Sequence, residues 1–407
     1  MPRFEPFRGI HYDFDRIDPA DVTAPPYDVI DPDLRATLAA RHPANVVHVD
    51  LPAHPDGEGD AYRHAAATFR RWLDDGTLLQ DPEPGFYVYR VDYLDDHGRA
   101  RHTTGVYGAL ELSPPGETPP GGGQPILPHE LTTPKAKSDR LALQRATRAN
   151  LSAVWGLSPT AGLTDLLDTT SDPLARWTDA DGVTHSLWRT TDEQRLQAIG
   201  AAVSGAPVVI ADGHHRYETA LRYLAEQGEG AAHGELTSSP AAVMTWVVEL
   251  ADDELCVQPI HRLLCGLPAG FDVAGALSWA FEIGEPVEVG PGVVERMQQE
   301  GFLVLVEPGG AVALRPRTEV LASTRDLDSC RLEASLRPLP PHDVVYQHGI
   351  RQVVDRVRKG EASAGVLLRP ATVRQIVEIA HGGERMPPKT TFFHPKPATG
   401  VVFRSLG

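Results

Sequence analysis

Cysteine is scarce in this sequence, and so is the basic charge that nucleic-acid-binding proteins carry. The 407 residues include three cysteines, Cys256, Cys265 and Cys330, which are too few and too scattered for a disulfide framework or a cysteine-rich zinc site. Lys and Arg number 38 against 55 Asp and Glu, which gives a formal charge of −17. This charge argues against broad nucleic-acid binding, which needs a basic surface, and it favours solubility.

Long apolar runs and several familiar enzyme motifs are missing as well. No stretch approaches the ~20 apolar residues of a membrane span. Residues 1–8 lack the apolar region of a secretory signal, so we expect a cytoplasmic protein with no membrane partner. The sequence contains no GxxxxGK[ST], no GxGxxG before a helix, no HExxH and no GxSxG. If the protein binds a nucleotide, it must do so through a less common arrangement.

Strand-like and helix-like patterns alternate along the chain, which predicts a mixed α/β fold. We expect strands at residues 45–51, 85–92, 101–112, 207–210, 241–250, 302–306 and 365–368. We expect helices at residues 61–73, at 138–155 with Ser138 as the N-cap, at 193–203, and from about Tyr217 onwards. Proline and glycine break this pattern most strongly near residues 113–123. The expected organisation is an N-terminal α/β region (1–113), a Pro/Gly linker or mobile loop (114–124), a catalytic core (125–265) and a C-terminal α/β region (266–407).

The densest polar signal is DGHHR, residues 212–216, between a short apolar strand and a helix. Gly213 permits a tight turn with positive φ. Unpaired backbone N–H groups at the start of a helix favour an anion, and Arg216 can hold phosphate or carboxylate through two parallel hydrogen bonds. Asp212 is a candidate metal ligand or a partner that orients a histidine. The alternative is structural, with His214 capping the turn and Arg216 paired to a surface acid.

A second polar segment, PHELTTPKAKSDR at residues 128–140, is locally cationic in an acidic chain. A helix is expected to begin inside it, and both features suit a phosphate or a nucleotide. Glu130 is a candidate general base toward a hydroxyl, or a metal ligand. The alternative is a solvated basic helix face. The basic residues of the segment and the helix after it are Lys135, Lys137, Arg140, Arg145 and Arg148.

Three weaker segments could be structural or functional. Pro25 and Pro26 form a rigid turn that presents Tyr27 and Asp28. Residues 259–262 contain a His-Arg pair that we interpret as structural. Residues 387–396 carry two lysines and several hydroxyl groups in a loop that could close over a ligand or simply pack.

Several of these segments together resemble the domain-of-unknown-function family 1015, whose name implies no activity. The matching segments span nearly the whole chain: APPYDVI (24–30), NVVHVDLP (45–52), PILPHELTTPKAKSDR (125–140), IADGHHRYETAL (210–221), PIHRLL (259–264) and MPPKTTFFHPKPATG (386–400). A more distant resemblance links the DGHHR turn to the phosphate-binding box of the ParB/sulfiredoxin superfamily, and most closely to its free-serine kinases. This resemblance implies a ParB/sulfiredoxin-like core with additional N- and C-terminal α/β regions.

The kinase resemblance implies transfer of a phosphoryl group from ATP or ADP, with Mg²⁺, to the hydroxyl of free serine or a related hydroxy acid. It implies Glu130 as the base, with Asp212 and His214 as further catalytic residues and Asp212 positioning Mg²⁺ or a histidine. The expected phosphate and nucleotide contacts are Gly213, His215, Arg216, Lys135, Lys137 and Arg140. The expected acceptor contacts are His129, Thr132, Tyr27 and Asp28.

Two other functions fit the same residues. In a metal-dependent phosphoesterase, Asp212, His214, His215 and Glu130 would bind Mn²⁺ or Zn²⁺ and activate water. A non-catalytic regulator would bind nucleotide without turning it over. The sequence leaves the oligomeric state, the acceptor and the choice between ATP and ADP open.

Overall fold

The chain divides into two compact units. Unit 1 comprises Met1–Cys256 and Pro395–Gly407, and unit 2 comprises Val257–His394, so the second unit is inserted in the sequence of the first. No helix in the described part of the chain combines the length and the apolar composition needed to cross a bilayer. The computed structural model describes residues 2–53, 58–95, 98–117, 125–128, 137–228, 235–381, 386–387 and 389–407.

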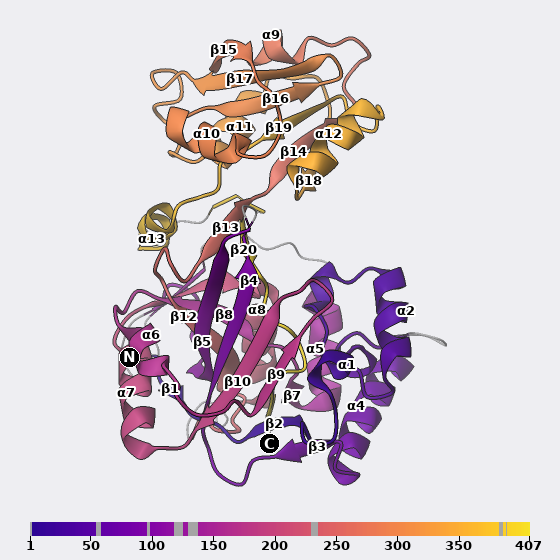
Figure 1. Ribbon diagram of the computed structural model, residues 1–407, viewed down its shortest axis with the longest axis vertical. Helices are drawn as coiled ribbons and strands as arrows, with labels where there is room; N and C mark the ends of the chain where they lie inside the picture. The colour runs from indigo at the N-terminus through magenta and orange to yellow at the C-terminus, as the bar shows by residue number, and fades with distance from the viewer. Residues whose placement is uncertain are drawn as a thin grey trace. The chain divides into compact units, whose positions relative to one another are not determined.

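Unit 1 is built on a large mixed sheet, whose strands lie side by side in Figure 1. Within the described residues nine strands form it, in the order β6-β11-β8-β12-β5-β4-β10-β9, with β1 beside β5. In chain order these are β1 (Phe4–Glu5), β4 (Phe86–Leu94), β5 (Ala100–Glu111), β6 (Ile126–Pro128), β8 (Val154–Ser158), β9 (Ala175–Thr178), β10 (Thr184–Thr190), β11 (Val208–Asp212) and β12 (Ala242–Glu249).

The central pairing of this sheet joins strands from both sides of the Pro/Gly-rich segment. β12 pairs with β5 on one side, antiparallel, and with β8 on the other, parallel. Trp155 of β8 and Trp246 of β12 are fully buried, with ring centroids 5.0 Å apart. One sheet of unit 1 therefore contains strands that precede and strands that follow this segment. Of the expected linker, Thr118–Gln124 lies outside the described residues.

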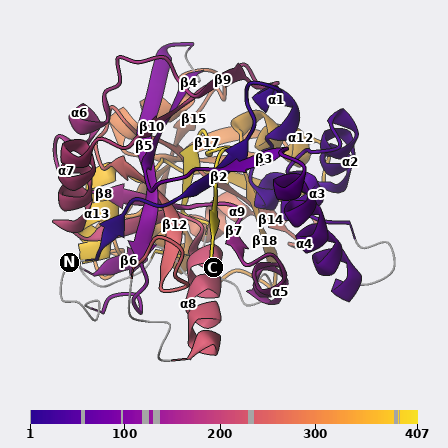
Figure 2. The same cartoon turned by 90° about the horizontal axis from the view of Figure 1, so that it is seen from below.

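A small sheet and a group of helices complete unit 1. The sheet has the order β3 (Leu78–Gln80), β2 (Gly9–Tyr12), β21 (Phe403–Ser405) and β7 (Ala149–Asn150). Figure 2 shows α8 (His214–Gln227) with α5 (Lys137–Thr147) beside it, and α5 also packs against α4 (Glu58–Asp74). The remaining helices of the unit are α1 (Pro19–Val22), the 3₁₀ turn η1 (Tyr27–Val29), α2 (Pro32–Arg41), α3 (Val47–Asp50), α6 (Leu163–Leu167) and α7 (Glu193–Ser204).

Unit 2 is a second α/β arrangement with helices on both faces of a sheet. α10 (Val293–Glu300) and α12 (Ile350–Arg358) supply buried residues to one core cluster, and α9 (Val273–Leu277) and α11 (Asp328–Leu336) supply them to another. α13 (Val373–His381) follows the sheet, and β13 (Cys256–Pro259) pairs with β20 (Thr391–His394). The sheet order in the described residues is β15 (Phe281–Pro286), β17 (Gly310–Pro316), β16 (Leu303–Glu307), β19 (Ala364–Leu367), β14 (His261–Cys265) and β18 (Asp343–Gln347).

The structure confirms the mixed α/β class and most of the expected elements. The strand predicted at residues 45–51 is wrong, because Val47–Asp50 forms the short helix α3. The side chain of Asn45 accepts the Val47 N–H at 3.1 Å and donates to the Asp21 carbonyl at 2.7 Å. These bonds start a helical turn, and burial of its valines outweighs their preference for strands.

The helix predicted at residues 138–155 is also shorter than expected. It ends at Thr147 because Arg148 adopts a left-handed conformation, with φ of 49°. The residues that follow form β7 and β8 instead of two further helical turns. α5 begins at Lys137, so Ser138 lies within the helix and is not its N-cap.

The last strand of unit 1 carries a fully buried arginine, Arg404. Its guanidinium donates to the carbonyls of Ala242 at 3.0 Å and Ser239 at 2.7 Å, and to that of Leu236. It also donates to the side-chain oxygen of Asn150 at 3.2 Å. A buried carbonyl group is costly unless it accepts a hydrogen bond. By donating to these groups, Arg404 holds β21 to residues 236–242 and to Asn150.

We therefore expect Arg404→Ala to lower the free energy of unfolding by roughly 3 kcal/mol, because several buried carbonyls lose their donors. The exposed Arg176 on β9 is the matched control, and Arg176→Ala should cost at most about 0.5 kcal/mol. Denaturant unfolding followed by tryptophan fluorescence measures both. Equal losses in the two variants would contradict the anchoring role of Arg404.

Candidate functional site

The predicted polar turn lies at the end of β11, where the strand passes into α8. The pairing register of β11 with β8 shifts between Ile210 and Asp212, and such an irregularity re-aims the side chains beyond it. Gly213 is the N-cap of α8 with φ of 89°, and no side chain caps this helix end. The turn therefore presents the N-terminus of a long helix directly beside the Asp212 carboxylate.

Asp212 lies between two cations from distant parts of the chain. Its Oδ2 accepts from Nη2 of Arg216 at 2.5 Å, and its Oδ1 is 3.2 Å from Nζ of Lys396. The same Nζ lies 2.5 Å from Oδ2 of Asp28. Burial alone would raise the pKa of Asp212, but Lys396 and Arg216 outweigh it and lower the pKa to about 2. Burial acts to lower the pKa of Lys396, and the carboxylates of Asp212 and Asp28 outweigh it and raise the pKa.

A second ion-pair group lies next to the first. The buried Arg140 on α5 donates to the backbone carbonyl of Asp50 at 2.6 Å and to its Oδ1 at 3.3 Å. It also pairs with Asp139 at 2.9 Å, and its guanidinium lies 4.1 Å from the ring centroid of Tyr27. Burial raises the pKa of the Asp50 carboxyl against the opposing charges of Arg140 and Arg216. Because the charge of Arg216 also lowers the pKa of Asp50, the two ion-pair groups act as one cluster.

A small cavity of about 40 Å³ lies between these groups, lined in part by Asp50, Arg140, Arg216 and Thr219. It has room for about one or two water molecules. Nε of Arg216 and the hydroxyl of Thr219 are buried and have no hydrogen-bond partner among the described residues. The cluster therefore retains unused polar groups although its charges are paired.

Two contacts hold Lys396 in this position. Ala24 and Thr399 form an antiparallel bridge, with N–H to O distances of 3.1 and 2.8 Å, which aligns the loop of Lys396 with the turn that carries Asp28. The N–H of Ala398 also donates to the buried Tyr89 hydroxyl at 3.2 Å.

A buried polar chain continues behind that tyrosine. The Tyr89 hydroxyl lies 2.7 Å from Nδ1 of His185, whose Nε2 is 3.1 Å from the carboxylate of Asp179. This Asp-His-Tyr chain crosses the sheet from β10 to β4 and ends on the backbone two residues from Lys396. It therefore orients the loop that supplies the second cation.

The structure thus brings together six of the predicted site residues: Asp212, Gly213, Arg216, Tyr27, Asp28 and Arg140. His214 and His215 lie in the first turn of α8, and His214 contributes to lowering the pKa of Asp212. The side chain of Lys137 lies outside the described part of the chain, although its backbone begins α5. His129, Glu130, Thr132 and Lys135 are outside the described residues, so their assignments stay predictions.

Sequence reasoning missed two members of the cluster, Lys396 and Asp50. Lys396 belongs to the loop at residues 387–396, which the sequence suggests could close over a ligand or pack, and its distance in sequence from Asp212 hid the contact. Asp50 was placed in a strand that is in fact α3. Both residues lie in segments that resemble the family, and that resemblance is the sequence signal that could have identified them.

The oxygen atoms of Asp28 and Asp212 are the groups in this cluster best suited to Mg²⁺, which binds one or two carboxylates together with substrate phosphates. Both carboxylates already face one cation, the Lys396 ammonium. Within the described ranges, no three His, Cys, Asp or Glu side chains gather closely enough to hold a metal ion. A divalent ion here would therefore need oxygen ligands from its substrate, as the residues present allow.

We expect Gly213→Ala to destabilise unit 1 for two reasons. A Cβ at Gly213 would lie 2.9 Å from Nε of the largely buried Arg216 side chain and would also be strained by the positive φ. Gly182 is a matched control, because its φ of 79° is similar and nothing lies within 4 Å of its added Cβ. Gly182→Ala should cost about 1 kcal/mol and Gly213→Ala at least about 2 kcal/mol in denaturant unfolding. Equal costs would show that the approach of Arg216 to the turn is unimportant.

We expect Asp212→Asn to lower the free energy of unfolding by roughly 2 kcal/mol at pH 7. The folded pKa of Asp212 is depressed to about 2, so its contribution is complete above the unfolded pKa of about 4 and is lost as pH falls toward 2. The difference between wild type and variant should therefore shrink between pH 4 and pH 2. Asp172→Asn, on the surface, is the control, and a pH-independent difference would contradict the assignment.

Comparison with known proteins gives a family and weak structural similarities. No curated protein sequence matches the chain. Among solved structures, free serine kinase in complex with AMP matches at 14% identity and a TM-score of 0.36, over 66% of this chain and 83% of that one. A conserved hypothetical protein from Pyrococcus furiosus matches at 15% identity and a TM-score of 0.34, over 66% and 86%. C-terminally truncated SbnI from Staphylococcus aureus matches at 12% identity and a TM-score of 0.36, over 67% and 82%.

These TM-scores describe weak similarity, and the assignment of the site residues does not depend on them. The family match is broader, since the family described as "Protein of unknown function (DUF1015)" covers residues 4–334. That range is well over half of the 407 residues. The chain therefore belongs to the DUF1015 family.

Proposed function

We propose that this chain is a small-molecule kinase that transfers a phosphoryl group from ATP or ADP to the hydroxyl of free serine or a related hydroxy acid. One observation carries the proposal: the uncapped N-terminus of α8 opens beside Asp212, with Arg216 and Lys396 on the same carboxylate. A helix N-terminus with two adjacent cations is suited to a phosphate group. Arg140 extends the positive charge to the neighbouring helix.

The reaction needs positioning and charge neutralisation more than covalent chemistry. The acceptor oxygen forms a bond to the terminal phosphorus, and the bond from that phosphorus to the bridging oxygen breaks. ADP leaves when ATP is the donor, and AMP leaves when ADP is the donor. The proton of the acceptor hydroxyl passes to a base, and the sequence resemblance gives that role to Glu130.

The residues of the cluster divide between the two substrates. The backbone of the Gly213 turn, with Arg216, would hold the phosphate that is transferred, and His214 and His215 would flank it. Arg140, Lys135 and Lys137 would hold the rest of the nucleotide. Tyr27 and Asp28, with His129 and Thr132, would hold the acceptor, whose ammonium group the Asp28 carboxylate complements.

Lys396 would change partners when a phosphate binds. In the structure its ammonium is shared by Asp28 and Asp212 at 2.5 and 3.2 Å. When a phosphate is bound, the same ammonium would donate to a phosphate oxygen, Asp212 would help to hold Mg²⁺, and Asp28 would be released to the ammonium group of the acceptor. The metal would neutralise phosphate charge when bound. Lys396 therefore keeps the two carboxylates from repelling each other until substrate arrives.

The test is phosphoryl transfer followed by phosphorus NMR. The full-length protein is mixed with Mg²⁺, ATP or ADP, and a panel of free serine, threonine, homoserine and glycerate. We expect a new phosphomonoester signal with at least one acceptor. Lys396→Ala and Asp212→Ala should reduce its rate by about 100-fold or more, because each removes a charged group from the phosphate site.

The matched control is Lys359→Ala, which removes a lysine from the C-terminal end of α12 in unit 2 and should leave the rate unchanged. Circular dichroism checks that each variant is folded. A chain that yields no ester with any acceptor and shows no nucleotide protection against thermal unfolding would overturn the proposal. Hydrolysis of nucleotide without an ester would instead support the phosphoesterase hypothesis.

A further inference from the structure

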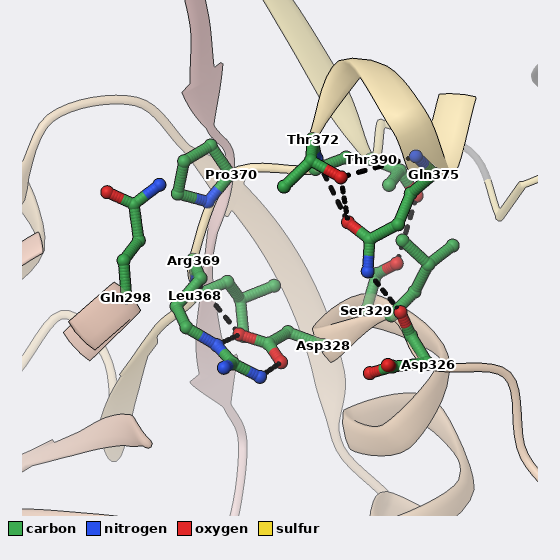
Figure 3. Close-up of a pocket in the computed structure, with 12 residues that line it drawn as sticks. Gln298, Asp326, Asp328, Ser329, Leu368, Arg369, Pro370, Thr372, Gln375 and Thr390 are labelled. Carbon is green, nitrogen blue, oxygen red and sulfur yellow. Dashed lines mark hydrogen bonds and ion pairs between the residues drawn. The ribbon is translucent and has the colours of Figure 1, made fainter. Parts of the chain in front are cut away.

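Unit 2 contains a cavity of about 210 Å³ that no part of the proposed kinase site uses (Figure 3). Its walls come from α10, from the start of α11, from the segment between β19 and α13, and from α13 itself. It has room for several water molecules or one small organic ligand. The polar residues that line it are Gln298, Asp326, Asp328, Ser329, Arg369, Thr372, Gln375 and Thr390.

One wall is an ion pair that is already complete. Arg369 donates to buried Asp328 through Nε at 2.9 Å and Nη2 at 2.5 Å, and its backbone N–H donates to the same carboxylate at 3.0 Å. Figure 3 shows this fork facing the start of α11. The pair therefore holds the guanidinium in a fixed orientation, and one of its amino groups, Nη1, has no hydrogen-bond partner among the described residues.

A second wall is also fixed by its own hydrogen bonds. The amide of Gln375 accepts from the backbone N–H and the hydroxyl of Thr372 at 2.9 and 3.1 Å. It also donates to the backbone carbonyl of Asp326 at 2.5 Å. These bonds cap α13 and tie it to the segment before α11. Their polar atoms are used, so a ligand must be recognised by other groups.

The polar groups of the cavity that remain available to a ligand are donors and an acceptor. Nη1 of Arg369, the amide of Gln298 and the first N–H groups of α11 are donors. No side chain caps α11, and Gln298 has no hydrogen bond among the described residues. The carboxylate of Asp326 is an acceptor that is 80% exposed, and its one ion-pair partner among the described residues is Arg331 at 2.8 Å. In the view of Figure 3, Gln298 and Asp326 lie on opposite sides of Arg369.

Of the charged residues that line the cavity, Arg369 pairs with Asp328, and Asp326 pairs with Arg331, which lies outside the lining. Together these two ion pairs carry no net charge. A multiply charged anion such as a nucleotide phosphate gains little from such a wall, and the Asp328 carboxylate opposes it. A molecule with one group of each sign matches both kinds of free partner. We propose that this cavity binds a small free α-amino acid.

The geometry assigns each end of that ligand. Its carboxylate would accept from Nη1 of Arg369, from Gln298 and from the N-terminus of α11. Its ammonium group would donate to Asp326. The rest of the lining contains Leu368, Pro370 and Ala371, which suit a short side chain. The cavity is lined only by residues of unit 2, so it is separate in sequence from the cluster around Asp212.

Calorimetric titration of the full-length protein with glycine, L-serine and L-threonine tests this site. Glycolate, which lacks the ammonium group, and ethanolamine, which lacks the carboxylate, are titrated in parallel. We expect at least one amino acid to bind, and both analogues to bind at least about tenfold more weakly. The titrations are made in Asp28→Ala, which removes the proposed ammonium partner of the kinase acceptor, as well as in wild type. Binding that persists in Asp28→Ala belongs to unit 2 whether or not the kinase proposal holds.

Two exposed positions allow variants that leave the buried ion pair intact. Asp326→Asn should weaken amino-acid binding by about tenfold and leave glycolate binding nearly unchanged, because it removes only the partner of the ammonium group. Gln298→Ala should weaken both several-fold. Gln299→Ala, one residue further along α10 and outside the cavity lining, should change neither. Absence of amino-acid binding, or binding that neither Asp326→Asn nor Gln298→Ala weakens, would overturn the proposal.

Discussion

The sharing of one carboxylate, that of Asp212, by two cations is the interaction on which the candidate site depends. Arg216 comes from the helix that begins beside this carboxylate, and Lys396 comes from the last segment of unit 1. Burial alone would raise the pKa of this carboxyl, and the two cations together lower it to about 2. Lys396 also pairs with Asp28, so it holds the turn that carries Asp28 in place. Three segments that are remote in sequence thus meet at the Lys396 ammonium group, which pairs with both Asp28 and Asp212.

Paired charge also explains how three cations are held close together in a strongly acidic chain. In the described cluster, Asp28, Asp50, Asp139 and Asp212 face Arg140, Arg216 and Lys396, so carboxylates outnumber cations. The arginines and the lysine are held in place before any ligand arrives, which lowers the entropic cost of binding. The same pairing means that phosphate must either displace carboxylates or bring a cation of its own. Such a site selects ligands whose groups can replace the carboxylates as partners of the arginines and the lysine. It does not attract anions in general through an excess of positive charge.

The sequence predicted local features well and long-range contacts poorly. Strands such as residues 85–92 and the turn at residues 212–216 carry their own signals, in alternating apolar residues and in Gly213, and the structure has both. The helix at Val47–Asp50 was missed because three nearby valines favour a strand locally, whereas Asn45 and burial decide the outcome. Lys396 could not be assigned to Asp212 because no local pattern encodes that contact. Glu130 lies outside the described residues, so its role stays a prediction.

The insertion of unit 2 within unit 1 has a consequence for the order in which the molecule is assembled. Lys396 and Arg404 are synthesised only after all of Val257–His394. Until then the small sheet lacks β21 and the Asp212 carboxylate lacks one of its two cations. Unit 2 can complete its own sheet while the first unit is still waiting for its final strand. A ribosome that stalls late would therefore leave unit 2 folded while unit 1 still lacks its final strand. Loss of residues near Arg404 would destabilise mainly unit 1, although most of unit 1 is synthesised first.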